Sequence, residues 1–153
     1  MSTKATPADA ELILKLYDLR RESEIRKARN WWLATFWPQT PDDVLKIASN
    51  MGSQENNWFR QVSGYWSMAA SLVDHGALDR DLFLEPSFSG EMFFIFAKVK
   101  PFLKELREKM SPTMFIAIET LINSTEKSRE FLQRVEGNLA NRKKAMAEVA
   151  KAS

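Results

Sequence analysis

In the C-terminal third of the chain, apolar residues recur at a spacing that puts them on one face only if the segment is a helix. From Met114 to Val149, eleven positions alternate four and three residues apart, and eight of them are apolar. This pattern is typical of the contact stripe of a coiled coil. In chain order the eleven are Met114, Ile118, Leu121, Thr125, Ser128, Leu132, Val135, Leu139, Arg142, Met146 and Val149.

A continuous helix over residues 112–150 would be roughly 58 Å long at ~1.5 Å per residue, longer than a domain of this size. Either the helix breaks near Gly137 and folds back, or its distal part, about 137–153, projects from the domain and packs elsewhere. Apolar stripes of that length are rarely left in water, and two-fold pairing commonly covers them. We therefore predict a homodimer through the C-terminal helix, with an interface at Leu132, Val135, Leu139 and Met146.

The rest of the chain also favours helices. Only five glycines and six prolines occur, and no stretch alternates apolar and polar residues as a half-buried strand would. Start signals predict helices from Pro7 to about Phe36, from Thr40–Pro41 to Gly52, after Ser89 with a break at Pro101, and from Ser111–Pro112 onward. The predicted fold is all-α, a single domain over residues 1–153 with about five main helices and a long C-terminal helix.

The segment from Trp58 to Val73 is the predicted centre of this domain. Its apolar residues form two adjacent rows at helical spacing, as expected for a helix buried on most sides. Trp66 lies in one of these rows, so we expect it in the core. A short turn follows, capped by Asp79 or Asp81.

Composition excludes several classes of protein. A net charge of +2 does not by itself indicate nucleic acid or an acidic membrane, and the basic residues of "IRKARNWW" fit a solvated helix face. No cysteine is available for disulfides, thiol catalysis or zinc–thiolate sites, and the longest apolar run is far too short to span a bilayer. The N-terminal residues lack the pattern of a signal peptide. We expect a cytoplasmic protein without a membrane span, and nucleic acid is not an expected partner.

The only histidine, His75, has two interpretations. Asp74 and His75 could form an acid/base couple, but neighbouring residues in a helix point about 100° apart. Gly76 follows, and glycine is the favoured residue just past a helix end. We therefore predict that His75 ends the central helix.

Other catalytic chemistry has no support in the residues. One histidine cannot complete a di-iron carboxylate site, and no phosphate-binding glycine loop or nucleophile elbow occurs. A cation site at Asp79, Asp81 and Glu85 is the weaker alternative to helix capping by these acids. We expect no catalytic residue, no metal and no cofactor, and hence no enzyme.

The aromatic residues of the middle leave one alternative open. Phe59, Trp66, Phe83 and Phe93 could together line an apolar cavity for a small ligand, although such clusters are more often plain core. An enzyme that uses carboxylates alone ranks third and would need a pair of buried, facing carboxylates.

The stretch "YWSMAASLVDHGALDRDLF" resembles uncharacterised bacterial helical proteins grouped as domains of unknown function, and a looser similarity extends over about a third of the chain. The resemblance implies an all-helical fold and a bacterial source, and it supplies no catalytic residues. Taken with the C-terminal stripe, the function we expect is that of a non-enzymatic helical interaction or scaffold module. The alternative is a binder of a small apolar ligand.

Overall fold

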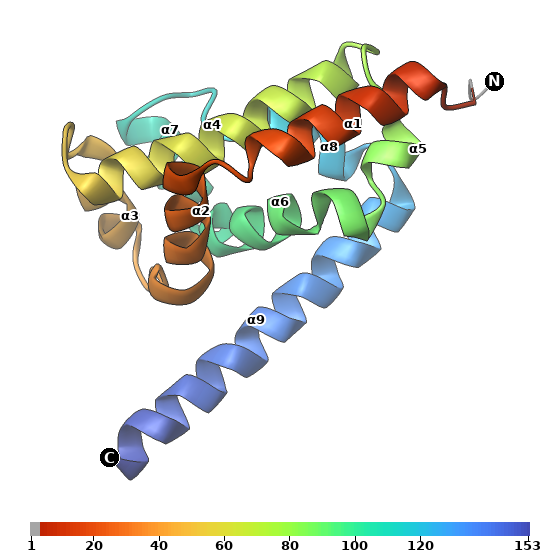
Figure 1. Cartoon of the computed structure of the whole chain (residues 1–153). Coiled ribbons are helices and arrows are strands. Elements are labelled where there is room, and N and C mark those ends of the chain that lie inside the picture. Colours follow the sequence, from red (N-terminus) through yellow and green to blue (C-terminus); the bar gives the residue numbers. More distant parts are fainter. Residues whose placement is uncertain (1–3) are drawn as a thin grey trace.

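The computed structural model describes residues 4–153, which are mostly helical, with no strand among them (Figure 1). The first three residues of the predicted domain lie outside the described residues. The all-α fold with a long C-terminal helix is confirmed. The elements are α1 (Pro7–Leu19), α2 (Ser23–Asn30), the π-helical turn η1 (Trp31–Thr35), α3 (Pro41–Ser49), α4 (Gln54–Asp74), α5 (Arg80–Phe83), α6 (Pro86–Val99), the 3-10 turn η2 (Lys100–Phe102), α7 (Leu103–Lys109), α8 (Ile116–Asn123) and α9 (Glu126–Ala152).

Hydroxyl and carboxylate side chains start most of these helices. Thr6 and Thr40 each form a capping box with the aspartate three residues later, and a proline follows each threonine. The Asp79 side chain accepts the Leu82 N–H at 2.8 Å and so begins α5. These bonds satisfy amide groups that have no partner within the helix. The predicted caps at Thr40 and Asp79 are thus confirmed.

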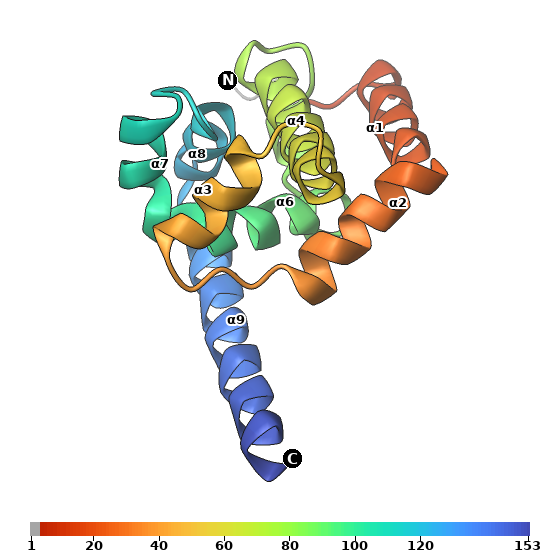
Figure 2. The same cartoon turned by 90° about the vertical axis from the view of Figure 1, so that its left-hand side faces the viewer.

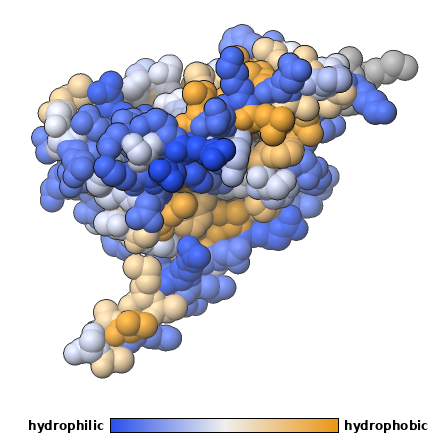
Figure 3. All heavy atoms as spheres, in the orientation of Figure 1, coloured by the Kyte–Doolittle hydropathy of each residue, from blue (hydrophilic) through white to orange (hydrophobic). Residues whose placement is uncertain are grey.

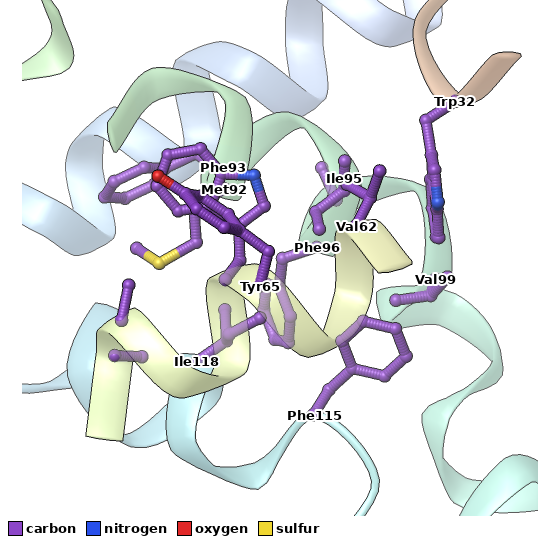
Figure 4. Packing of buried hydrophobic residues seen from close by; sticks show 14 of the residues in the cluster. Trp32, Val62, Tyr65, Met92, Phe93, Ile95, Phe96, Val99, Phe115 and Ile118 are labelled. Atoms are coloured by element: carbon purple, nitrogen blue, oxygen red, sulfur yellow. The ribbon is translucent and has the colours of Figure 1, made fainter. Parts of the chain in front are cut away.

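The core lies around α4 and α6. α4 packs against α2, α3 and α8, while α6 packs against α8 and α9. Trp66 is 1% exposed, so its predicted core position is confirmed, and the residues labelled in Figure 4 show how α4, α6 and α8 interdigitate. The two apolar rows of α4 therefore face different neighbours, as expected of a central helix.

The predicted helix over residues 7–36 is wrong as one piece. It stops after Leu19 and begins again at Ser23, where the Glu22 side chain accepts the N–H groups of Glu24 and Ile25. The apolar residues before and after this corner lie on different faces of a straight helix, so the break lets both halves reach the core. The predicted break at Pro101 is confirmed, because α6 gives way to η2 there. The helix predicted after Ser89 starts earlier, at Pro86.

The predicted continuous C-terminal helix is also wrong. α8 starts at Ile116, after Phe115 with a left-handed φ of 59°, and ends at Asn123. Thr125 then caps α9 by accepting the Ser128 N–H at 3.0 Å. The Ser128 hydroxyl donates back to the Ile122 carbonyl and closes the corner. Two polar positions of the four–three stripe thus form a helix corner.

α9 runs without a break through Gly137, so of the two alternatives left open by the sequence, a break near that residue does not occur. Its first half packs on α6, and every residue from Ala140 to Ser153 is exposed. Figures 1 and 2 both show this end of the helix leaving the rest of the molecule. We call residues 140–152 distal α9.

Candidate functional site

Three of the four predicted interface residues are covered by the chain itself. Leu132, Val135 and Leu139 are 5, 8 and 6% exposed and belong to the hydrophobic core. The first half of α9 lies on α6, so the chain itself buries most of these three side chains, while Val135 also lines an open groove and stays a predicted contact. The fourth residue, Met146, lies on distal α9 and is 47% exposed.

Distal α9 forms one wall of an open groove, which we call the α6–α9 groove. Its volume is about 1070 Å³, and the opposite wall comes from η1, the loop after it and α6. Figure 3 shows apolar surface where α6 and α9 diverge. The apolar side chains lining the groove are Leu33, Ala34, Trp37, Phe94, Val135, Ala145 and Met146.

Basic residues accompany the apolar side of distal α9. Distal α9 has one acidic residue, Glu148, and four basic residues, none of which forms an ion pair within residues 4–153. The four are Arg142, Lys143, Lys144 and Lys151. Arg142 lies over the Phe94 ring, 6.0 Å from its centroid, at the floor of the groove. The projecting helix thus offers both apolar and positively charged contacts.

Lys98 is buried next to the groove and was missed by the sequence interpretation. Its Nζ donates to the carbonyls of Trp32 and, at 2.7 Å, Phe36, and it lies 3.9 Å from the Trp37 ring centroid. One carbonyl lies near the start of η1 and the other directly follows η1, so the amine holds this turn against α6. Burial, and then the positive charges of Arg142 and Lys143, lower the pKa of Lys98 to about 7.

The four residues of the predicted ligand cavity do not share one space. Trp66 and Phe83 are neighbours, with ring centroids 6.3 Å apart, and both line a pocket beneath α1. Phe93 lines a different pocket with Phe131, and Phe59 packs on Trp32 and lines a third. The structure therefore brings two of the four together and separates the rest.

His75 ends α4, as predicted. Its Nδ1 lies 2.8 Å from the Ser71 carbonyl, and Gly76 has a φ of +77°, a left-handed conformation that favours glycine. The ring is thus placed over the last turn of the helix. Among residues 4–153 no group of three or more His, Asp or Glu side chains could hold a metal, which includes the acids Asp79, Asp81 and Glu85.

Glu91 on α6 has a largely buried carboxylate, with a side chain 8% exposed. One oxygen accepts Nε of Arg29 at 2.8 Å, and the other accepts Nε1 of Trp66 at 3.1 Å. Both oxygens therefore have structural partners. They tie α2, α4 and α6 together.

Within residues 4–153, no helix is long and apolar enough to cross a membrane. No curated protein and no solved structure matches the chain. A family match covers residues 5–125, that is α1 to the cap of α9, and α9 itself follows the matched region. The resemblance found in the sequence is confirmed over a longer stretch than expected, while the bacterial source stays a prediction. The chain belongs to the family described as Domain of unknown function (DUF4760).

Proposed function

We propose that this chain is a non-enzymatic interaction module of the cytoplasm that forms a homodimer through distal α9. The observation that carries the proposal is the α6–α9 groove, whose apolar walls have no covering segment of the described chain. In the dimer, distal α9 of each copy lies in the groove of the other. Such a contact is isologous, since each copy supplies both the helix and the groove.

Exposure along distal α9 supports this arrangement. Met146 is 47% and Val149 70% exposed, and they lie three residues apart on the same side of the helix. Trp37 and Phe94 on the opposite wall are only partly covered by the core. A second helix in the groove would contact both walls at once and remove these side chains from water.

The distribution of charge also favours a second copy. Residues 126–153 have seven Lys or Arg and four Asp or Glu, whereas residues 31–125 have eight and eleven. In the groove the basic helix of one copy then lies between the distal α9 of the other, which is also basic, and its more acidic body, so complementary charge is found on the body side. Complementary charge of this kind guides association more than it adds affinity.

Light scattering over the micromolar range tests the proposal with two matched variants. Met146→Asp places a charge on the groove side, and Ala147→Asp places the same charge about 100° around the helix. We expect a dimer for the unmodified chain and for Ala147→Asp, and a dissociation constant at least about tenfold higher for Met146→Asp, as for one charge buried without a partner.

A monomer for the unmodified chain at all these concentrations would refute self-association. Equal dissociation constants for the two variants would refute the groove as the contact. Because both positions are exposed, far-UV circular dichroism should show the same helix content in all three proteins.

A further inference from the structure

A second pocket lies beneath α1, away from the α6–α9 groove. Its volume is about 240 Å³, and it is bordered by α1, α4, α5 and the start of α6. Apolar side chains form most of its lining, among them Ile13, Tyr17, Trp66, Phe83 and Phe88. Figure 3 shows apolar surface beside α1, the helix labelled in the same orientation in Figure 1.

Arg20 is the one charged residue that lines this mostly apolar pocket. Arg20 is only 8% exposed, and its Nε is buried without a hydrogen-bond partner. Its side chain forms no ion pair with any residue of 4–153. The guanidinium instead lies between two rings, 5.2 Å from the centroid of Tyr17 and 5.1 Å from that of Trp66.

The neighbouring polar groups cannot neutralise this charge. Glu91 is shared between Arg29 and the Trp66 indole, as described above. The Tyr65 hydroxyl donates to the Leu16 carbonyl at 2.6 Å. A buried guanidinium that has ring contacts but no carboxylate is costly, and an anion at this point would remove the cost.

We propose that the pocket binds a small amphipathic carboxylate, with its carboxylate on Arg20 and its apolar body against Trp66 and Phe83. At the roughly 30 Å³ that a water occupies in the liquid, the pocket has room for about eight non-hydrogen atoms. That size fits a compact aromatic acid or most of a medium-chain fatty acid, and because the pocket is open to solvent, the last atoms of a ten-atom acid such as octanoate can extend from its mouth. The inference is independent of dimer formation, because no residue of α9 lines this pocket.

Isothermal titration calorimetry of the whole chain with octanoate tests the proposal, with octan-1-ol as the neutral analogue of equal chain length. We expect octanoate to bind with a submillimolar dissociation constant and octan-1-ol at least about tenfold more weakly, the difference typical of one charge-assisted contact. Arg20→Met keeps the apolar stem of the side chain and should reduce the affinity for octanoate to that for octan-1-ol. Arg21→Met, a change at an exposed neighbour, should leave octanoate binding unaltered.

Absence of octanoate binding at millimolar concentrations would overturn the proposal. Equal affinity for octanoate and octan-1-ol would overturn the role of Arg20, and so would an Arg20→Met variant that binds octanoate normally. If Arg20→Met does not fold, the two ligands on the unmodified chain still decide the question. The Trp66 indole N–H resonance should shift with octanoate, and a resonance that stays fixed at saturation would place the ligand elsewhere.

Discussion

Replacing Trp66 by alanine tests the packing around α4. The side chain is 1% exposed, contacts the rings of Tyr65 and Phe83, and lies under the Arg20 guanidinium. Truncating a buried tryptophan leaves a cavity that costs about 3–5 kcal/mol of unfolding free energy. The lost indole donor also removes one of the two partners of Glu91, which adds about 1 kcal/mol.

We therefore expect Trp66→Ala to lower the unfolding free energy by roughly 4–6 kcal/mol, or the melting temperature by about 12–18 °C for a chain of this length. Urea denaturation followed by circular dichroism measures the first quantity directly. Trp66→Phe, which keeps a ring but loses the N–H, should cost about 1–2 kcal/mol.

Met68→Ala provides the matched control, because Met68 lies on the same helix and is 47% exposed. It should change stability by no more than about 0.5 kcal/mol. A loss below about 1 kcal/mol for Trp66→Ala would refute the central position of α4. A loss equal to that of Met68→Ala would do so as well.

Two further predictions concern Lys98 and Thr125. Because the pKa of Lys98 is lowered to about 7 in the folded protein, the unfolded chain binds more protons above that pH. The unfolding free energy should thus rise between pH 7 and 9.5 with a slope of up to roughly 1.4 kcal/mol per pH unit, and Lys98→Met should lack this part of the slope in urea titrations. Equal slopes for the two proteins would contradict the burial of this amine. Thr125→Ala removes the cap of α9 and should lower the unfolding free energy by about 1–2 kcal/mol. Thr113→Ala, a control at an exposed turn, should lower it much less. Equal melting temperatures for the two variants would argue against the corner at Thr125.

Several features of the fold were predictable because one local rule decides each of them. The capping box at Thr40, the break at Pro101 and the end of α4 at His75–Gly76 depend on residues close in sequence. The central place of α4 followed from its two apolar rows, which leave little room for a solvent face. In each case no distant part of the chain competes with the local preference.

The corners were harder to predict. Glutamate is not among the preferred N-cap residues, so the corner at Glu22 has no clear signal in the sequence. At Thr125 a capping residue occupies a position of the four–three stripe, and spacing alone does not distinguish a cap from a polar contact position. The corner at Thr125 is favoured by tertiary packing, because it lets α8 pack mainly on α4 and the first half of α9 pack on α6.

In the candidate sites, too, local patterns were predictable from the sequence and tertiary contacts were not. The stripe on α9 indicated that Leu132, Val135 and Leu139 must be covered, but periodicity does not say whether the same chain or a second one covers them. Arg20 and Lys98 are long basic residues, a type that hydrophobic periodicity places on the exposed face of a helix. Their burial depends on rings brought from other parts of the chain, Trp66 for Arg20 and Trp37 for Lys98.

Cross-linking between two different variant chains tests the dimer most directly. Because the sequence has no cysteine, each variant carries a single thiol and no other disulfide can form. One chain carries Met146→Cys on distal α9, and the other, distinguished by a mass tag, carries Ala34→Cys on the opposite wall of the groove. Mild oxidation of the mixture should give a disulfide-linked pair of the two different chains. A mixture with Ala147→Cys in place of Met146→Cys should give far less. Equal yields from the two mixtures, or no cross-linked pair in either, would contradict the insertion of distal α9 into the groove of a second copy.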